Sequence, residues 1–309
     1  MTARFILSLD CEGKWGVTHH LRRWEQRTLS DGSLRRAYGS ILSLLDEFEV
    51  PATFAFVGLF GETATSFRRL RPLVETTSGL ARQLLQPALD DMDHGSGEGW
   101  HGDWAVDAVG GGAAGHEIAF QGATHVPWDV MDEKQLLTEI EIYRQLKGPV
   151  SKSRTMVYPR NRVAFPHILP SMGIEAFRLA RSQSRPMSLA GEFNIYARPE
   201  SDPAQEPTGP VAIPAGYFVN WRHGLRRLVP VALSLQRFSN LLDQAERTGR
   251  VVHYWLHPEN VASEPATLEL LRAMMKRLAS ARSSGRCRVL TQWDYCRETK
   301  AALPEGSKR

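Results

Sequence analysis

The sequence predicts a parallel α/β fold, because short apolar segments alternate with amphipathic helical segments along the 309-residue chain. Polar residues recur where the apolar segments end, at Asp10, His125, Arg160 and His257. In an α/β barrel this end of the strands carries the active site. The segments with the composition of buried strands are 4–10, 52–57, 116–120, 155–159, 174–179, 251–256 and 288–291.

The first sixty residues show how the strands and helices alternate. Residues 33–49 carry apolar side chains at helical spacing, and Val50 and Pro51 end that pattern. A strand, a helix and a strand in this order imply parallel strands joined by a right-handed crossover. Similar spacing predicts helices over 66–89, 132–146, 163–172, 236–247 and 264–283, with Asp132 as an N-cap.

One domain is expected over residues 1–300. Two irregular insertions interrupt the pattern, at about 61–112 and 182–235. Within the first, residues 90–99 are polar and rich in glycine, which is typical of a surface loop. Residues 301–309 are expected to form a flexible tail.

Composition excludes several classes of protein. No run of eighteen apolar residues exists, so no membrane span is expected. The three cysteines (Cys11, Cys287 and Cys296) have no regular spacing of the kind that forms a disulfide framework. The first residues do not resemble a signal peptide. Both observations predict a cytoplasmic protein. The net charge of +4 is mild and scattered, and no phosphate-binding glycine motif is present. We therefore expect no nucleic-acid partner.

Asp10 and Glu12 lie two residues apart on an extended segment, so their side chains point the same way. Two close carboxylates repel each other, and a divalent cation relieves the repulsion. One acid can then bind the metal while the other takes a proton from water. A helix cap or an arginine partner explains the two acids equally well.

Three further segments carry candidate chemistry. His125 is a good ligand for a transition metal, whereas Gln121 is a poor one, and a lone histidine is often structural. Arg160 can hold a carboxylate through two parallel hydrogen bonds, or simply lie on the surface. His257 can protonate a leaving group near neutral pH. His253, four residues earlier on the same side of the strand, is expected in the core.

Together these segments resemble the polysaccharide deacetylases, also called NodB-homology proteins or family 4 carbohydrate esterases. Residues 52–58 are similar to the second-strand signature of the family. Residues 115–118, leading to Thr124 and His125, resemble its metal-binding segment. The resemblance covers roughly residues 4–180 and 248–295, and it implies a distorted (β/α) barrel with a divalent metal, often zinc.

The resemblance also implies a role for each residue of the metal site. Glu12 resembles the metal-binding acid where the spacing is Asp-x-acid, and in the commoner Asp-Asp form that position is Cys11. His125 resembles the second metal histidine of the family. The first metal histidine aligns with Gln121, so weaker zinc binding is expected.

The remaining roles concern catalysis. Asp10 resembles the catalytic base, Arg160 the arginine that orients this base, and His257 the catalytic acid. The sugar is expected to contact residues near these motifs, which are Trp15, Trp128 and Asn161.

The function implied is that of a hydrolase of non-peptide carbon–nitrogen bonds, which removes an N-acetyl group from an amino sugar. A cytoplasmic member would meet a nucleotide-linked or lipid-linked sugar, in the synthesis of a surface polysaccharide such as an O-antigen or capsule. Two alternatives remain. Gln121 favours a barrel that has lost catalysis and binds a glycan or a partner protein. A hydrolase of a non-sugar amide, such as a cyclic ureide, is the other.

Overall fold

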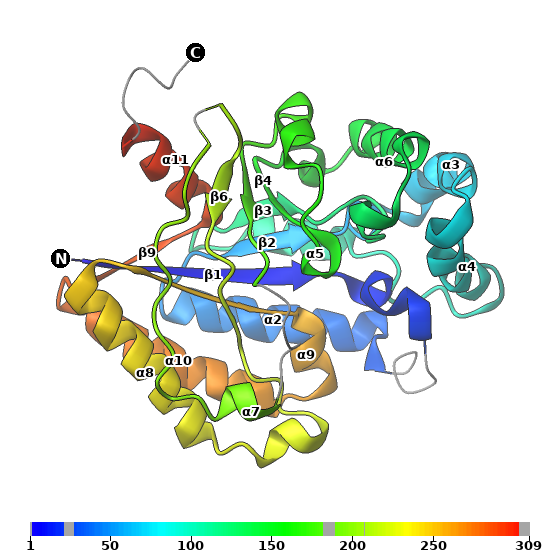
Figure 1. The fold of residues 1–309 in the computed structure, drawn as a ribbon. Helices are drawn as coiled ribbons and strands as arrows, with labels where there is room; N and C mark the ends of the chain where they lie inside the picture. The colour runs from blue at the N-terminus through cyan, green and yellow to red at the C-terminus, as the bar shows by residue number, and fades with distance from the viewer. Residues whose placement is uncertain (1, 22–27, 182–188, 207, 303–309) are drawn as a thin grey trace.

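A curled, nine-stranded parallel sheet forms the centre of the molecule (Figure 1). The computed structural model describes residues 2–21, 28–181, 189–206 and 208–302. The sheet order is β6-β5-β4-β3-β2-β1-β8-β7, and β9 pairs with the first half of β1. The strands are β1 (Ala3–Cys11), β2 (Thr53–Phe56), β3 (Glu117–Phe120), β4 (Thr155–Val157), β5 (Ala176–Arg178), β6 (Val211–Ile213), β7 (Tyr217–Phe218), β8 (Val251–Leu256) and β9 (Cys287–Leu290).

The chain connection between β6 and β7 requires the sheet to curl. These strands stand at opposite ends of the sheet order, yet only residues 214–216 separate them. So short a segment spans at most about 14 Å. The ring of His253 in β8 donates from Nδ1 to the carbonyl oxygen of Pro214 at 2.7 Å, which ties this connection to the sheet. The predicted distorted (β/α) barrel is therefore confirmed.

Side chains of β1 alternate between the outer helices and the barrel interior, as strand geometry requires. The odd-numbered residues belong to the main hydrophobic core, whereas Ile6 belongs to a second cluster inside the barrel. The inner column continues through Ser8 to Asp10 and Glu12. Both acids therefore face the interior at the carboxyl end of the strand. The odd-numbered residues are Ala3, Phe5, Leu7, Leu9 and Cys11.

Helices surround the sheet and close one end of it (Figure 1). Tyr295 and Cys296 of α11 pack against Ile6 and Val251, so α11 covers the amino end of the strands. The opposite end carries the polar residues. The α-helices are α2 (Asp31–Glu47), α3 (Ala64–Glu75), α4 (Gly79–His94), α5 (Asp103–Gly110), α6 (Glu133–Gln145), α7 (Leu189–Glu192), α8 (Val231–Thr248), α9 (Pro258–Ser263), α10 (Ala266–Ser283) and α11 (Gln292–Ala302).

Short 3-10 helices fill several connections. The segment 163–172, predicted as a helix, contains the 3-10 helix η5, because Pro166 and Pro170 lack the N–H groups that a regular α-helix uses. The others are η1 (Gly13–His20), η2 (Trp128–Val130), η3 (Pro149–Lys152), η4 (Pro159–Asn161) and η6 (Gly224–Leu228), and η5 spans Pro166–Met172.

The first insertion is more helical than predicted. The single helix expected over 66–89 is two helices, because α3 ends at Glu75 and α4 begins at Gly79, which has a φ of +57°. Helix α4 continues to His94, so the predicted loop is shorter. Helix α11 runs to Ala302, and residues 303–309 of the predicted tail lie outside the described residues. Among the described helices, none is long and apolar enough to cross a membrane.

Candidate active site

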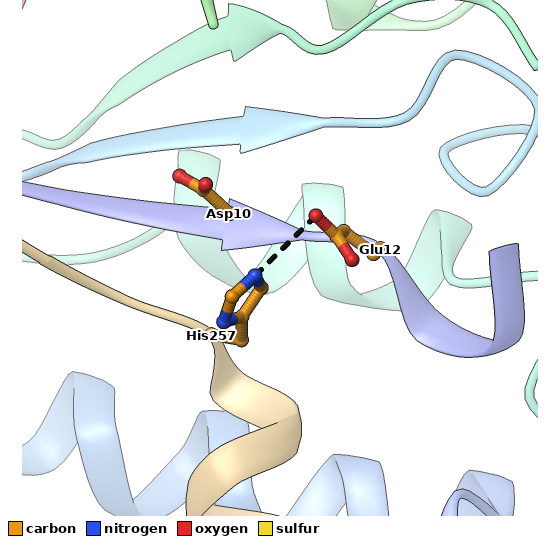
Figure 2. A group of neighbouring side chains, drawn as sticks. All are labelled: Asp10, Glu12 and His257. Carbon is orange, nitrogen blue, oxygen red and sulfur yellow. Dashed lines mark ion pairs between the residues drawn. The ribbon is translucent and has the colours of Figure 1, made fainter. Parts of the chain in front are cut away.

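The polar residues singled out in the sequence meet at the carboxyl ends of the strands. Asp10 and Glu12 come from the end of β1, and His257 follows β8 directly. Gln121 and His125 follow β3. Figure 2 shows Glu12 and His257 facing each other, with Asp10 one step back along β1. The predicted convergence of these strand ends is present in the structure.

The carboxylate of Glu12 is the centre of this cluster. Its Oε1 accepts a hydrogen bond from Gln121 Nε2 at 2.8 Å and lies 3.0 Å from His125 Nε2. The same oxygen lies 3.4 Å from His257 Nε2. A methyl group at Gly16 would stand 1.9 Å from Glu12 Oε2, so only glycine leaves room for this carboxylate.

The loop after β3 is held by a buried acid of α6. Glu139 accepts hydrogen bonds from the backbone N–H of Ala123 at 2.6 Å and from that of Thr124 at 3.2 Å. Its other oxygen accepts from the Thr124 hydroxyl at 2.9 Å. These bonds support a backbone in which His125 has a φ of +61°, a region that costs energy for a residue other than glycine. The helix therefore fixes where the His125 ring points.

Opposite charges govern protonation around Glu12. Burial alone would raise the pKa of Glu12, but the charges of His125 and His257 and their hydrogen bonds hold it well below its usual range. Burial alone would lower the pKa of His257, but Glu12 and Asp10 raise it to about 9. Burial and the charge of Glu12 raise the pKa of Glu259 to about 7. At neutral pH the cluster thus holds an ionised Glu12 beside a protonated His257.

Asp10 is bound by Arg178, at the end of β5. The guanidinium donates from Nη1 to Asp10 Oδ1 at 2.8 Å and from Nη2 to Oδ2 at 2.6 Å. It also donates to Ser8 Oγ at 2.9 Å and to Asn161 Oδ1 at 2.7 Å. The Trp255 ring lies under it, 4.9 Å from the guanidinium carbon. Two parallel hydrogen bonds fix the orientation of the carboxylate.

A neutral histidine supports this arginine through Ser8. Because His253 Nδ1 donates to the carbonyl of Pro214, its Nε2 is free to accept the hydroxyl proton of Ser8 at 2.8 Å. Burial and the charge of Arg178 lower the pKa of His253 to about 3, so the ring stays neutral. His253 is fully buried, as expected.

The prediction that Arg160 orients Asp10 is wrong. Arg160 Nη2 instead donates to His19 Nδ1 at 2.7 Å. The arginine that binds Asp10 is Arg178. One signal in the sequence could have identified Arg178. It lies two residues after Ala176 on a predicted strand, and so on the same face, at the carboxyl end where polar residues gather.

The predicted sugar contacts of two tryptophans are also wrong. Trp15 is fully buried, and its indole N–H donates to the carbonyl of Trp100 at 3.0 Å. Trp128 is fully buried with its ring edge-on to Tyr158. Neither ring has a free face. Trp255 is partly exposed, and its ring centre lies 5.7 Å from that of His257.

Asn161 has a different outcome. Its side-chain oxygen accepts from Arg178, so it helps to hold the arginine that binds Asp10. The side chain is partly exposed. A contact between Asn161 and a sugar stays a prediction.

The residues around Glu12 fit a divalent metal. Neighbouring ligand atoms around a tetrahedral zinc ion with bonds of about 2 Å are about 3.3 Å apart. The spacing from Glu12 Oε1 to His125 Nε2, 3.0 Å, is close to this value. Gln121 Oε1 and His125 Nδ1 are buried without a hydrogen-bond partner among the described residues. One ligand atom each of Asp10, Glu12 and His257 also lie within 4.8 Å of one another.

Comparison with known proteins identifies the fold. No protein-family model matches the sequence, and no curated protein is similar to it in sequence. A structure described as a polysaccharide deacetylase from Mycobacterium smegmatis superposes with a TM-score of 0.60 at 17% identity, covering 97% of this chain and 91% of that one. The chain has the polysaccharide deacetylase fold. This confirms the resemblance at the level of the fold.

Two further structures share this deacetylase fold. One is described as a polysaccharide deacetylase from Pseudomonas aeruginosa, with a TM-score of 0.54, 14% identity and coverage of 97% of this chain and 92% of that one. The other is Puue allantoinase, with a TM-score of 0.52, 16% identity and coverage of 97% and 91%. At these identities the similarity describes the fold and not the substrate.

Proposed function

We propose that the protein is a metal-dependent hydrolase that removes the N-acetyl group from an amino sugar. The observation that carries this proposal is the buried Glu12 carboxylate, with Gln121, His125 and His257 around it, beside an Asp10 that Arg178 holds. Glu12, His125 and Gln121 would hold the metal, with the Gln121 amide turned to present Oε1. A divalent metal in such a site polarises an acyl carbonyl and makes water more acidic.

Asp10 is the proposed general base. Each of its oxygens keeps a lone pair after the two hydrogen bonds from Arg178, so it can still accept a proton. Ser8 and Asn161 hold the guanidinium, so the carboxylate meets the attacking water in one orientation.

His257 is the proposed general acid. Its pKa of about 9, in the protein without a metal, keeps it protonated at neutral pH. It directly follows β8, the strand that pairs with β1, so it lies beside Asp10 and can give a proton to the departing amine as the carbon–nitrogen bond breaks. The Trp255 ring beside it is partly exposed, and its exposed part is the proposed contact for the sugar.

The proposal includes a setting for the reaction. The substrate is an amino sugar linked to a nucleotide or a lipid, used in the cytoplasm to build a surface polysaccharide such as an O-antigen or capsule. Three free, buried cysteines are in keeping with a reducing compartment.

A second candidate is hydrolysis of a cyclic ureide. The shared fold with a structure named as an allantoinase supports it. A barrel that only binds a glycan is the third, and it is favoured by Gln121, because an amide is a weak zinc ligand.

The test uses protein loaded with Zn²⁺ or Co²⁺ and measures the free amine formed from an acetylated sugar, or the carboxylate formed when the allantoin ring opens. The substrates are UDP-N-acetylglucosamine, N-acetylglucosamine oligomers and allantoin. Amine release from an acetylated sugar is expected, with turnover reduced at least about 100-fold in Asp10→Asn. Arg160→Gln is the matched control and retains most of the turnover. Hydrolysis of allantoin alone supports the second candidate, and metal binding without any turnover supports the third. Undiminished deacetylation by Asp10→Asn contradicts the assigned base.

A further inference from the structure

Exposed apolar side chains gather on one part of the molecule. Among the described residues, four of the seven exposed large hydrophobic side chains lie between residues 193 and 228. Leu225 and Leu228 are 71% and 65% exposed. Exposed groups of this kind mark surfaces that meet a partner or a membrane. We call the following set the rim surface: Phe193, Tyr196, Arg198, Leu225, Arg227 and Leu228.

Hydrogen bonds bring the two stretches of the rim surface together. Arg226 in η6 donates to Glu192 of α7 at 2.8 Å, which places η6 beside α7. Farther along, Arg237 of α8 donates to the carbonyl of Gly191 at 2.9 Å. Asn240 donates to the carbonyl of Ile195, also at 2.9 Å. The segment 191–196 therefore runs along α8 from η6, as Figure 1 shows for α7 and α8.

The charge of this region is positive. No Asp or Glu occurs between residues 207 and 242, where four arginines stand at 222, 226, 227 and 237. Residues 193–199 add Arg198 and no acid. Glu192 is buried between Arg226 and Arg237, so its charge is compensated. The flanking acids Glu200 and Asp243 pair with arginines of their own.

The η6 end of the rim surface, with Leu225, Arg227 and Leu228, lies beside the mouth of the candidate active site. The Arg226 guanidinium carbon is 5.6 Å from the centre of the Phe218 ring. The Phe218 ring in turn lies 6.0 Å from the ring of His257. Two contacts thus connect η6 to the proposed general acid. A surface bound to η6 would be held close to the strand ends.

We propose that the rim surface docks the protein on an anionic lipid membrane. Leucine and aromatic side chains beside arginines are the composition of segments that lie in a membrane interface. An anionic polymer in solution would select the arginines, but it would gain nothing from Leu225 and Leu228. If the proposed function holds, docking presents the head group of a lipid-linked amino sugar to the site.

The test is co-sedimentation with vesicles, which needs no turnover and no metal. The protein is expected to sediment with vesicles of phosphatidylcholine and phosphatidylglycerol, and far less with phosphatidylcholine alone. Arg227→Gln should weaken binding roughly fivefold, since one arginine near such a surface contributes that factor. Leu225→Ser combined with Leu228→Ser should weaken it more than about tenfold. Raising the salt concentration should also weaken it.

A matched control separates docking from general stickiness. Leu80 and Leu137 are 52% and 59% exposed, on α4 and α6 away from the rim surface. Replacing both by serine should leave vesicle binding unchanged. Equal losses in the two double variants overturn the proposal, as does an absence of sedimentation with anionic vesicles. A third outcome also overturns the proposal: the protein does not bind vesicles but forms a concentration-dependent dimer, and Leu225→Ser combined with Leu228→Ser abolishes that dimer. The surface would then bind a second copy of the chain. The hydrolase proposal stands or falls separately, on amine release.

Discussion

Among substitutions at the site, those that break the buried ion pair between Arg178 and Asp10 should lower the free energy of unfolding most. Both side chains are 1% exposed or less, and two hydrogen bonds of 2.6 and 2.8 Å join them. Arg178→Met removes the guanidinium and leaves a carboxylate buried without its partner. Breaking a buried pair in this way costs about 3–5 kcal/mol. This is a large part of a typical free energy of unfolding of about 5–15 kcal/mol.

Asp10→Asn should cost a similar amount, because it leaves the guanidinium buried without its partner. The double variant removes both charges, so its cost should fall short of the sum of the single costs by at least about 2 kcal/mol. Urea denaturation at pH 7, followed by circular dichroism, measures all three free energies. Arg160→Met is the control and should cost less than about 1 kcal/mol, since Arg160 pairs with an exposed histidine. Single costs that add to within about 0.5 kcal/mol would refute the reasoning.

Three further predictions concern neighbours of this pair. His253 has a pKa of about 3 in the folded protein, below its value in the unfolded chain. The unfolded chain therefore binds a proton first as the pH is lowered, and the free energy of unfolding decreases. From pH 6.5 down to pH 5 the free energy of unfolding should decrease by about 2 kcal/mol. The midpoint of urea denaturation should depend less on pH in His253→Gln than in the wild type. An equal pH dependence in the two proteins would contradict this. Gly16→Ala places a methyl group against the Glu12 carboxylate, so zinc affinity measured by calorimetric titration should fall at least about tenfold. Gly39→Ala is the control and should leave the affinity unchanged, because a methyl group at Gly39 would have open space around it. His257→Gln should lose turnover but keep its metal; loss of the metal would make this histidine a ligand instead of the acid.

The first strand was the most predictable part of the site. Alternation along β1 places Asp10 and Glu12 on one face, and a buried strand has to turn its polar end toward the barrel mouth. The same reasoning holds for His257 after β8. These predictions depend only on local geometry and on the shared direction of parallel strands.

Alternation along β5 could place Arg178 at the barrel mouth, but it could not show that Arg178 binds Asp10. β5 and β1 are separated by three strands in the sheet order, so Arg178 reaches Asp10 only because the sheet curls. That curl depends on the short connection between β6 and β7, within an insertion whose strands have only three and two residues. Closeness in sequence also misled for Trp15. It follows Glu12 by three residues, yet η1 turns its ring into the core against Trp100.

The central claim is that Glu12 is the core of a metal centre beside the Asp10 base. Calorimetric titration of Zn²⁺ into the metal-free protein tests it most directly, with the Glu12→Gln and His125→Ala variants measured in parallel. One equivalent bound by the wild type, with affinity lost in both variants, is the predicted result. Failure of the wild type to bind Zn²⁺, or binding that survives both substitutions, would contradict the claim.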